Sequence, residues 1–183
     1  MAYYYFLMAQ LPAIIPSAKP SVNYQEYKEL ASRYLSRHDM KILDKLTLEP
    51  PRTGERTGSD VVDEWFERER SLRLNLAKLR GQKISRNVHI TTGETEALAL
   101  QVSVSQAARN AVSLENPLEA ERQLLKLRLQ WLEELRGNHF FDSEAVFIYG
   151  LTLLLRERGD RFTVEAGQDA YESIYTQILG EEA

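Results

Sequence analysis

The stretch that decides the fold is NPLEAERQLLKLRLQWLEELRGNHFFDSEAVFIYGLTLLLRERG, residues 116–159. Its first half repeats leucine at helical spacing, and Asn116 with the following proline suits a helix N-terminus while Gly137 suits its end. Asp142 then suits the N-cap of a second helix, in which residues 145–155 are almost wholly apolar. The stretch therefore predicts two consecutive helices, the second buried at the centre of the fold.

Other parts of the chain show the same spacing. Asn23 and Ser36 stand where helix caps are expected, and Gly81 and Gly159 suit helix ends. The part around 100–104 alternates as a strand would, but a capping pair ahead of it favours a helix. The further helices that we expect cover residues 23–35, 36–46, 60–80, 91–114 and 163–179.

Two of these helices have a clear apolar face. In the helix over 60–80 we expect the inward residues to be Val61, Val62, Trp65, Phe66, Leu72, Leu76 and Leu79. In the last helix, Ala170, Tyr171, Ile174 and Ile178 share one face. The chain is thus predicted to be all-α, a helical bundle of about six to seven helices in a single domain over 1–183. Two lobes are the alternative, with a linker near 49–59 or 82–92.

Composition and motifs argue against a catalytic site or a metal site. The chain has 183 residues, 43% hydrophobic and 27% charged, with a net charge of -4 and no cysteine. The absence of cysteine excludes disulfides and thiolate catalysis and fits a cytoplasmic protein. His38, His89 and His139 lie in three separate segments without a metal-ligand motif, and the chain has no Walker loop or nucleophile elbow. We expect a non-enzyme with no cofactor, metal or small-molecule substrate.

The opening MAYYYFLMAQLP is apolar without being a signal or an anchor. The first basic residue is Lys19, after the apolar run has ended, whereas a signal peptide begins with positive charge. The run is also under half the roughly 20 residues that a spanning helix needs. We expect this segment to pack in the core or to form an interface, with Tyr3, Tyr4 and Tyr5 as candidate anchors.

A basic stripe lies between Arg68 and Arg86, where seven cations accompany one acid, Glu69. Such a stripe suits an acidic protein surface or phosphates, and a solvated helix face explains it equally well. No aromatic residue lies between Phe66 and Trp131, so the stacking platform of single-strand binders is missing and no nucleic acid is expected. The candidate contact residues are Arg68, Arg73, Arg80 and Lys83.

Several stretches together resemble a known family: YYYFLMAQLP, EWFERERSLRLNLAKLR, and NPLEAERQLLKLRLQWLEEL followed by HFFDSEAVFIYGLTLLLRER. They are similar to a family of small bacterial proteins related to the C subunit of V-type ATP synthases, called the d subunit in eukaryotes, and associated with bacterial V-type ATPase operons. The C subunit has three similar helical lobes, whereas 183 residues suffice for one or two.

The resemblance implies a non-catalytic, C-subunit-like protein of a V-type ATPase that serves ion transport or ATP synthesis. Its expected partners are the central-stalk subunits and the membrane rotor ring, and its expected location is the inner face of the cytoplasmic membrane, held there through protein contacts. A stand-alone helical adaptor or regulator, binding nucleic acid through the stripe over 68–86, is the alternative. Steep salt dependence of binding would mark that alternative.

Overall fold

The computed structural model describes residues 3–15, 18–52, 56–85, 88 and 102–181. The described part is helical, and its one non-helical pairing is an isolated antiparallel bridge between Tyr3 and Asp142. This confirms the all-α prediction. The helices are α1 (Tyr5–Gln10), α2 (Tyr24–Ala31), α3 (Arg37–Leu43), α4 (Asp60–Lys83), α6 (Val102–Ser113), α7 (Pro117–Arg136), α8 (Ser143–Asp160) and α9 (Val164–Glu181).

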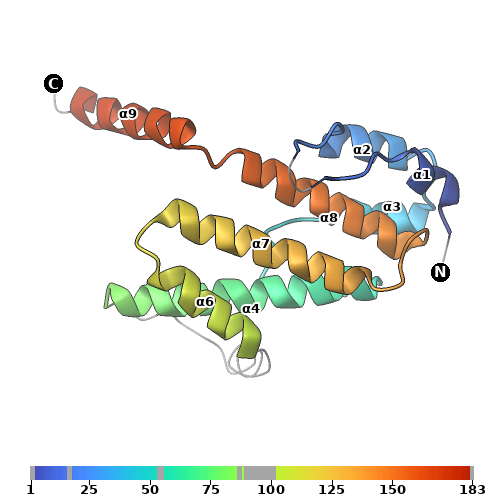
Figure 1. Cartoon of the computed structure of the whole chain (residues 1–183), viewed down its shortest axis with the longest axis horizontal. Helices are drawn as coiled ribbons and strands as arrows, with labels where there is room; N and C mark the ends of the chain where they lie inside the picture. The colour runs from blue at the N-terminus through green and yellow to red at the C-terminus, as the bar shows by residue number, and fades with distance from the viewer. Residues whose placement is uncertain (1–2, 16–17, 53–55, 86–87, 89–101, 182–183) are drawn as a thin grey trace.

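Helix α8 is the central element. It contacts α2, α3, α4 and α7, while α6 packs against α4 and α7 (Figure 1). Both faces of α8 are thereby covered, which explains why its residues from Ala145 to Leu155 are almost continuously apolar. The predicted central position of this helix is confirmed.

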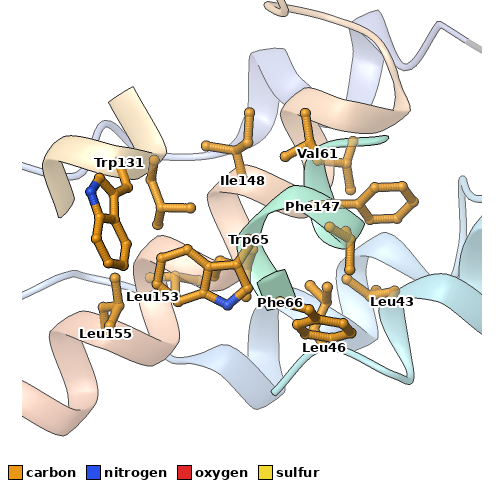
Figure 2. Packing of buried hydrophobic residues seen from close by; sticks show 14 of the residues in the cluster. Leu43, Leu46, Val61, Trp65, Phe66, Trp131, Phe147, Ile148, Leu153 and Leu155 are labelled. Atoms are coloured by element: carbon orange, nitrogen blue, oxygen red, sulfur yellow. The ribbon is translucent and has the colours of Figure 1, made fainter. Parts of the chain in front are cut away.

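The core lies between α8 and its neighbours. Figure 2 shows Trp65 and Trp131 with side chains of α8 around them, and the two indole rings meet edge to face with centroids 6.4 Å apart. The face predicted for α4 is confirmed, because all of its members are buried except Leu79, which is partly buried against the core. Side-chain packing between the two tryptophans therefore joins α4 to α7.

The predicted N-caps are present. Asn23 forms a reciprocal capping box with Glu26 at the start of α2, and Ser36 accepts a hydrogen bond from the Asp39 amide at 3.1 Å. Asn116 and Asp142 cap α7 and α8 by accepting amide hydrogen bonds at 2.9 and 3.0 Å. Each cap satisfies an amide that the helix leaves unpaired, so the helix starts are well determined by sequence.

Two predicted helix ends are wrong. Helix α4 continues through Gly81 to Lys83, and α8 continues through Gly159 to Asp160. At Gly159 a β-carbon would lie 2.6 Å from Leu125 Cδ2, so this glycine allows α8 to approach α7 closely and does not cap the helix. Gly137, in contrast, ends α7 as predicted, with a positive φ of 41°.

The last helix is present, but its apolar residues are not buried. Tyr171 and Ile174 are exposed, and Figure 1 shows α9 beyond the end of α8 and away from the bundle. No helix in the described ranges is long and apolar enough to cross a membrane. The first part of the helix predicted over 91–114 lies outside the described residues, as do parts of both expected linkers, so the division into lobes stays a prediction.

Candidate protein interface

The N-terminal segment and the turn between α7 and α8 meet at one end of the bundle. The Tyr4 amide donates a hydrogen bond to the Phe141 carbonyl at 2.5 Å, next to the bridge between Tyr3 and Asp142. Asp142 is at the same time the cap of α8 and the partner of His139 Nδ1 at 2.6 Å. The N-terminal segment is thus fastened to the residues that begin the central helix.

Tyr4 fixes the N-terminal segment to helix α3. Its hydroxyl donates a hydrogen bond to the buried Asp39 carboxylate and accepts one from the Ser36 amide at 3.1 Å. Burial, followed by the hydrogen bond to Asp39, raises the pKa of Tyr4. Tyr4 is therefore a core residue that fixes the segment to α3, and it is not an interface anchor as the sequence suggested.

The neighbours of Tyr4 point outward and form an aromatic patch. Tyr3 and Tyr5 stack with ring centroids 5.7 Å apart, and Tyr5 packs against Phe141 at 5.0 Å. Tyr5 is 55% exposed and Phe6 79% exposed. We define the aromatic patch as Tyr3, Tyr5, Phe6, Phe140 and Phe141, all of them exposed large hydrophobic residues.

A surface of this composition is typical of a binding site. Aromatic residues dominate the energy of protein interfaces, and an exposed cluster of them costs hydration free energy until a partner covers it. The patch also rests on a firm base, because Tyr4, beneath it, is hydrogen-bonded to the core. The patch can therefore bind a partner with little loss of backbone freedom.

The structure divides the predicted basic stripe in two. Arg68 donates hydrogen bonds to Glu64 and Glu134, both at 2.8 Å, and its guanidinium lies 6.0 Å from the Trp131 ring centroid. Arg80 is exposed, and the exposed Lys83 donates a hydrogen bond to the Val112 carbonyl. The charge of Arg68 is thus compensated within the chain, whereas Lys78, Arg80 and Lys83 are exposed at the other end of the stripe.

Arg73 belongs to a buried ion-pair cluster. The Arg128 guanidinium makes two hydrogen bonds to Glu69, both 2.9 Å long, and Arg73 Nε donates to the same carboxylate at 2.9 Å. Arg73 also contacts Glu49 at 3.3 Å. Burial by itself would lower the pKa of Arg128, but the hydrogen bonds to Glu69 together with the negative charges of Glu69, Glu121 and Glu49 outweigh burial, and the pKa is raised. The cluster ties α4 to α7, so Arg73 has a structural role.

Sequence reasoning missed part of the aromatic patch. Phe6, Phe140 and Phe141 were not predicted as contact residues, although the pair of phenylalanines in HFFD stands directly before the Asp142 cap. Nothing in the sequence indicates that residues 3–6 meet residues 140–141. Among the described residues no cluster could hold a metal ion, and His89 lies outside them.

The fold and this surface define a class: an all-helical protein that presents an aromatic patch at one end of its bundle. The chain belongs to the family described as "Protein of unknown function (DUF2764)", whose model matches residues 53–181. No curated protein and no solved structure matches it.

Proposed function

We propose that the chain is a non-catalytic, C-subunit-like component of a bacterial V-type ATPase, which couples the central stalk to the membrane rotor ring. The observation that carries the proposal is the aromatic patch, an exposed apolar surface fixed on a rigid base. A coupling element must bind without yielding under torque, and rigid aromatic anchors meet that requirement. The resemblance of the opening, middle and α7–α8 stretches to the C-subunit-related family supplies the identity of the partners.

The basic residues support a protein partner better than a nucleic acid. Arg68 and Arg73 are paired with carboxylates inside the chain, so two of the seven cations of the stripe are not available to a phosphate backbone. Arg80 and Lys83 can still add a charged rim to a protein contact. In this proposal the protein acts at the cytoplasmic face of the membrane, through protein contacts alone.

Co-expression tests the proposal. A tagged copy is produced with the central-stalk and rotor-ring subunits of its own host's V-type ATPase, and native mass spectrometry identifies what co-purifies. We expect a complex containing the chain, stalk subunits and ring. A chain that purifies free of both, while the stalk and ring assemble with each other, would refute the proposal.

A matched pair of variants links the result to the aromatic patch. Tyr5→Ser removes a ring that is 55% exposed in the patch, and Tyr175→Ser removes one that is 54% exposed on α9. We expect the first to lower the yield of the complex and the second to leave it unchanged. Equal yields for the two variants would remove the patch from the proposal.

A further inference from the structure

The ion-pair cluster around Glu69 belongs to a closed ring of charges. Each carboxylate of the ring contacts two arginines and each arginine contacts two carboxylates, at distances from 2.9 to 3.5 Å. The ring joins α4, α7 and α8 to the connection between α3 and α4. In order around the ring, its members are Glu49, Arg73, Glu69, Arg128, Glu121 and Arg158.

Glu49 is the loosely held member of this ring. Its side chain is 67% exposed, more than that of any other member. One oxygen, Oε1, serves both of its partners, with Arg73 Nη2 at 3.3 Å and Arg158 Nη1 at 3.5 Å. Charge-assisted hydrogen bonds are shorter, about 2.7–2.9 Å. Because exposed ion pairs of this kind contribute little to stability, Glu49 can leave the ring at little cost.

The arginines are held in place by the other two carboxylates. Arg158 Nε donates to Glu121 at 3.2 Å, and its Nη2 lies 3.0 Å from the same oxygen. Arg73 and Arg128 are both hydrogen-bonded to Glu69 at 2.9 Å. The three guanidinium groups should therefore keep their positions when Glu49 moves away, so the site that it leaves is preorganised.

Arg128 brings a donor that Glu49 does not satisfy. The Arg128 side chain is 6% exposed, and its Nη1 is buried without a hydrogen bond in the described part of the chain, 3.5 Å from Glu121 Oε1. Glu49 is near enough for its negative charge to act on Arg128. A buried donor without an acceptor costs free energy, so an anion with more oxygens would fit this place better than Glu49 does.

We propose that Arg73, Arg128 and Arg158 form a binding site for a phosphate group, and that Glu49 occupies this site when phosphate is absent. Guanidinium forks match phosphate oxygens, and the several oxygens of a phosphate can accept from all three arginines at once. Without Glu49 the ring holds three cations and two anions, so the site is positive. Arg73 and Arg158 are partly exposed, which gives a phosphate access from the solvent. The inference goes beyond the proposed function and does not rest on it.

Calorimetric titration of the full chain with inorganic phosphate at constant ionic strength tests the site. Glu49→Gln removes the competing charge and leaves the arginines in place, so it should bind phosphate about fivefold more tightly than the wild type. Glu67→Gln makes the same change at an exposed position of α4 outside the ring, and it should bind as the wild type does. A Glu49→Gln variant that binds no phosphate, or binds it no better than Glu67→Gln, would overturn the inference.

Arginine variants in the Glu49→Gln background show where the phosphate binds. Arg158→Gln should weaken phosphate binding about tenfold, because it removes a charged donor. Arg80→Gln makes the same substitution at an exposed position of the basic stripe and should leave binding unchanged. Circular dichroism shows whether each variant keeps its helices. Equal weakening by the two variants would mean that phosphate binds the stripe, and the inference would be wrong.

Two further probes of the Glu49→Gln variant define the ligand. Acetate has fewer oxygens than phosphate and cannot engage all three arginines, so it should bind at least about tenfold more weakly. Methyl phosphate should bind as tightly as inorganic phosphate if the natural ligand is a small phosphate ester, and more weakly if it is the free ion. Both of these orders support a phosphate site, whereas acetate that binds as tightly as phosphate would contradict it.

Discussion

Arg128→Met is expected to destabilise the protein by about 3 kcal/mol. The side chain of Glu69 is 0% exposed and that of Arg128 is 6% exposed, so the substitution leaves a carboxylate buried without its main partner. Loss of one member of a buried ion pair costs about 3–5 kcal/mol. The lower end applies here, because Arg73 Nε still donates to Glu69 at 2.9 Å. In a chain of this size, that corresponds to a fall in Tm of roughly 6–12 °C.

Thermal and urea unfolding followed by circular dichroism measures this loss. Fluorescence of Trp65 and Trp131 reports the same transition, because both tryptophans lie in the core between α4 and α7. Arg122→Met is the matched control, since it makes the same substitution at an exposed position of the same helix. We expect the control to change stability by no more than about 0.5 kcal/mol.

The double variant Glu69→Met, Arg128→Met tests the reasoning further. It removes both charges together, so it should be more stable than Arg128→Met alone even though it carries one more substitution. Two results would refute the argument: an Arg128→Met variant as stable as the Arg122→Met control, or a double variant that is less stable than Arg128→Met alone.

Two further predictions concern packing and pH. Gly150→Ala should destabilise the protein by about 1–3 kcal/mol, because the added β-carbon would lie 3.0 Å from Tyr27 Cε1. Gly167→Ala has open space around it and should stabilise α9 by about 0.5–1 kcal/mol. Thermal unfolding measures both changes. Burial raises the pKa of Tyr24 and Tyr149 to about 12. Below about pH 10 both phenols are protonated in the folded and in the unfolded protein. Between about pH 10 and 12 only the unfolded protein releases these protons, so the free energy of unfolding should fall as the pH rises across that window. The double variant Tyr24→Phe, Tyr149→Phe should flatten the fall, and an unchanged slope in urea unfolding would count against the assignment.

The helices themselves could be predicted because their signals are local. Asn23, Ser36, Asn116 and Asp142 cap the helices that follow them, and a cap depends only on residues two or three positions away. The misplaced end at Gly159 shows the limit of this approach. A glycine that ends a helix and a glycine that allows close packing look alike in sequence, and only the distance to Leu125 separates them.

The candidate interface could be predicted only in part. The tyrosine run stands out in the sequence, but the distinction between Tyr4 and its neighbours depends on Asp39, which lies on another helix. The pairing of Arg68 in the basic stripe cannot be read from the sequence for the same reason. Glu134 is far from Arg68 in sequence and contacts it only in the folded chain.

The affinity of the purified chain for a purified assembly of central stalk and rotor ring tests the central claim most directly. We expect measurable binding by the wild-type chain, and a loss of about 2 kcal/mol, roughly 30-fold in Kd, for each of Tyr5→Ser and Phe6→Ser, with no change for Tyr175→Ser. Failure of the wild-type chain to bind, or equal affinity of all four proteins, would contradict the claim that the aromatic patch docks this protein onto a rotary ATPase.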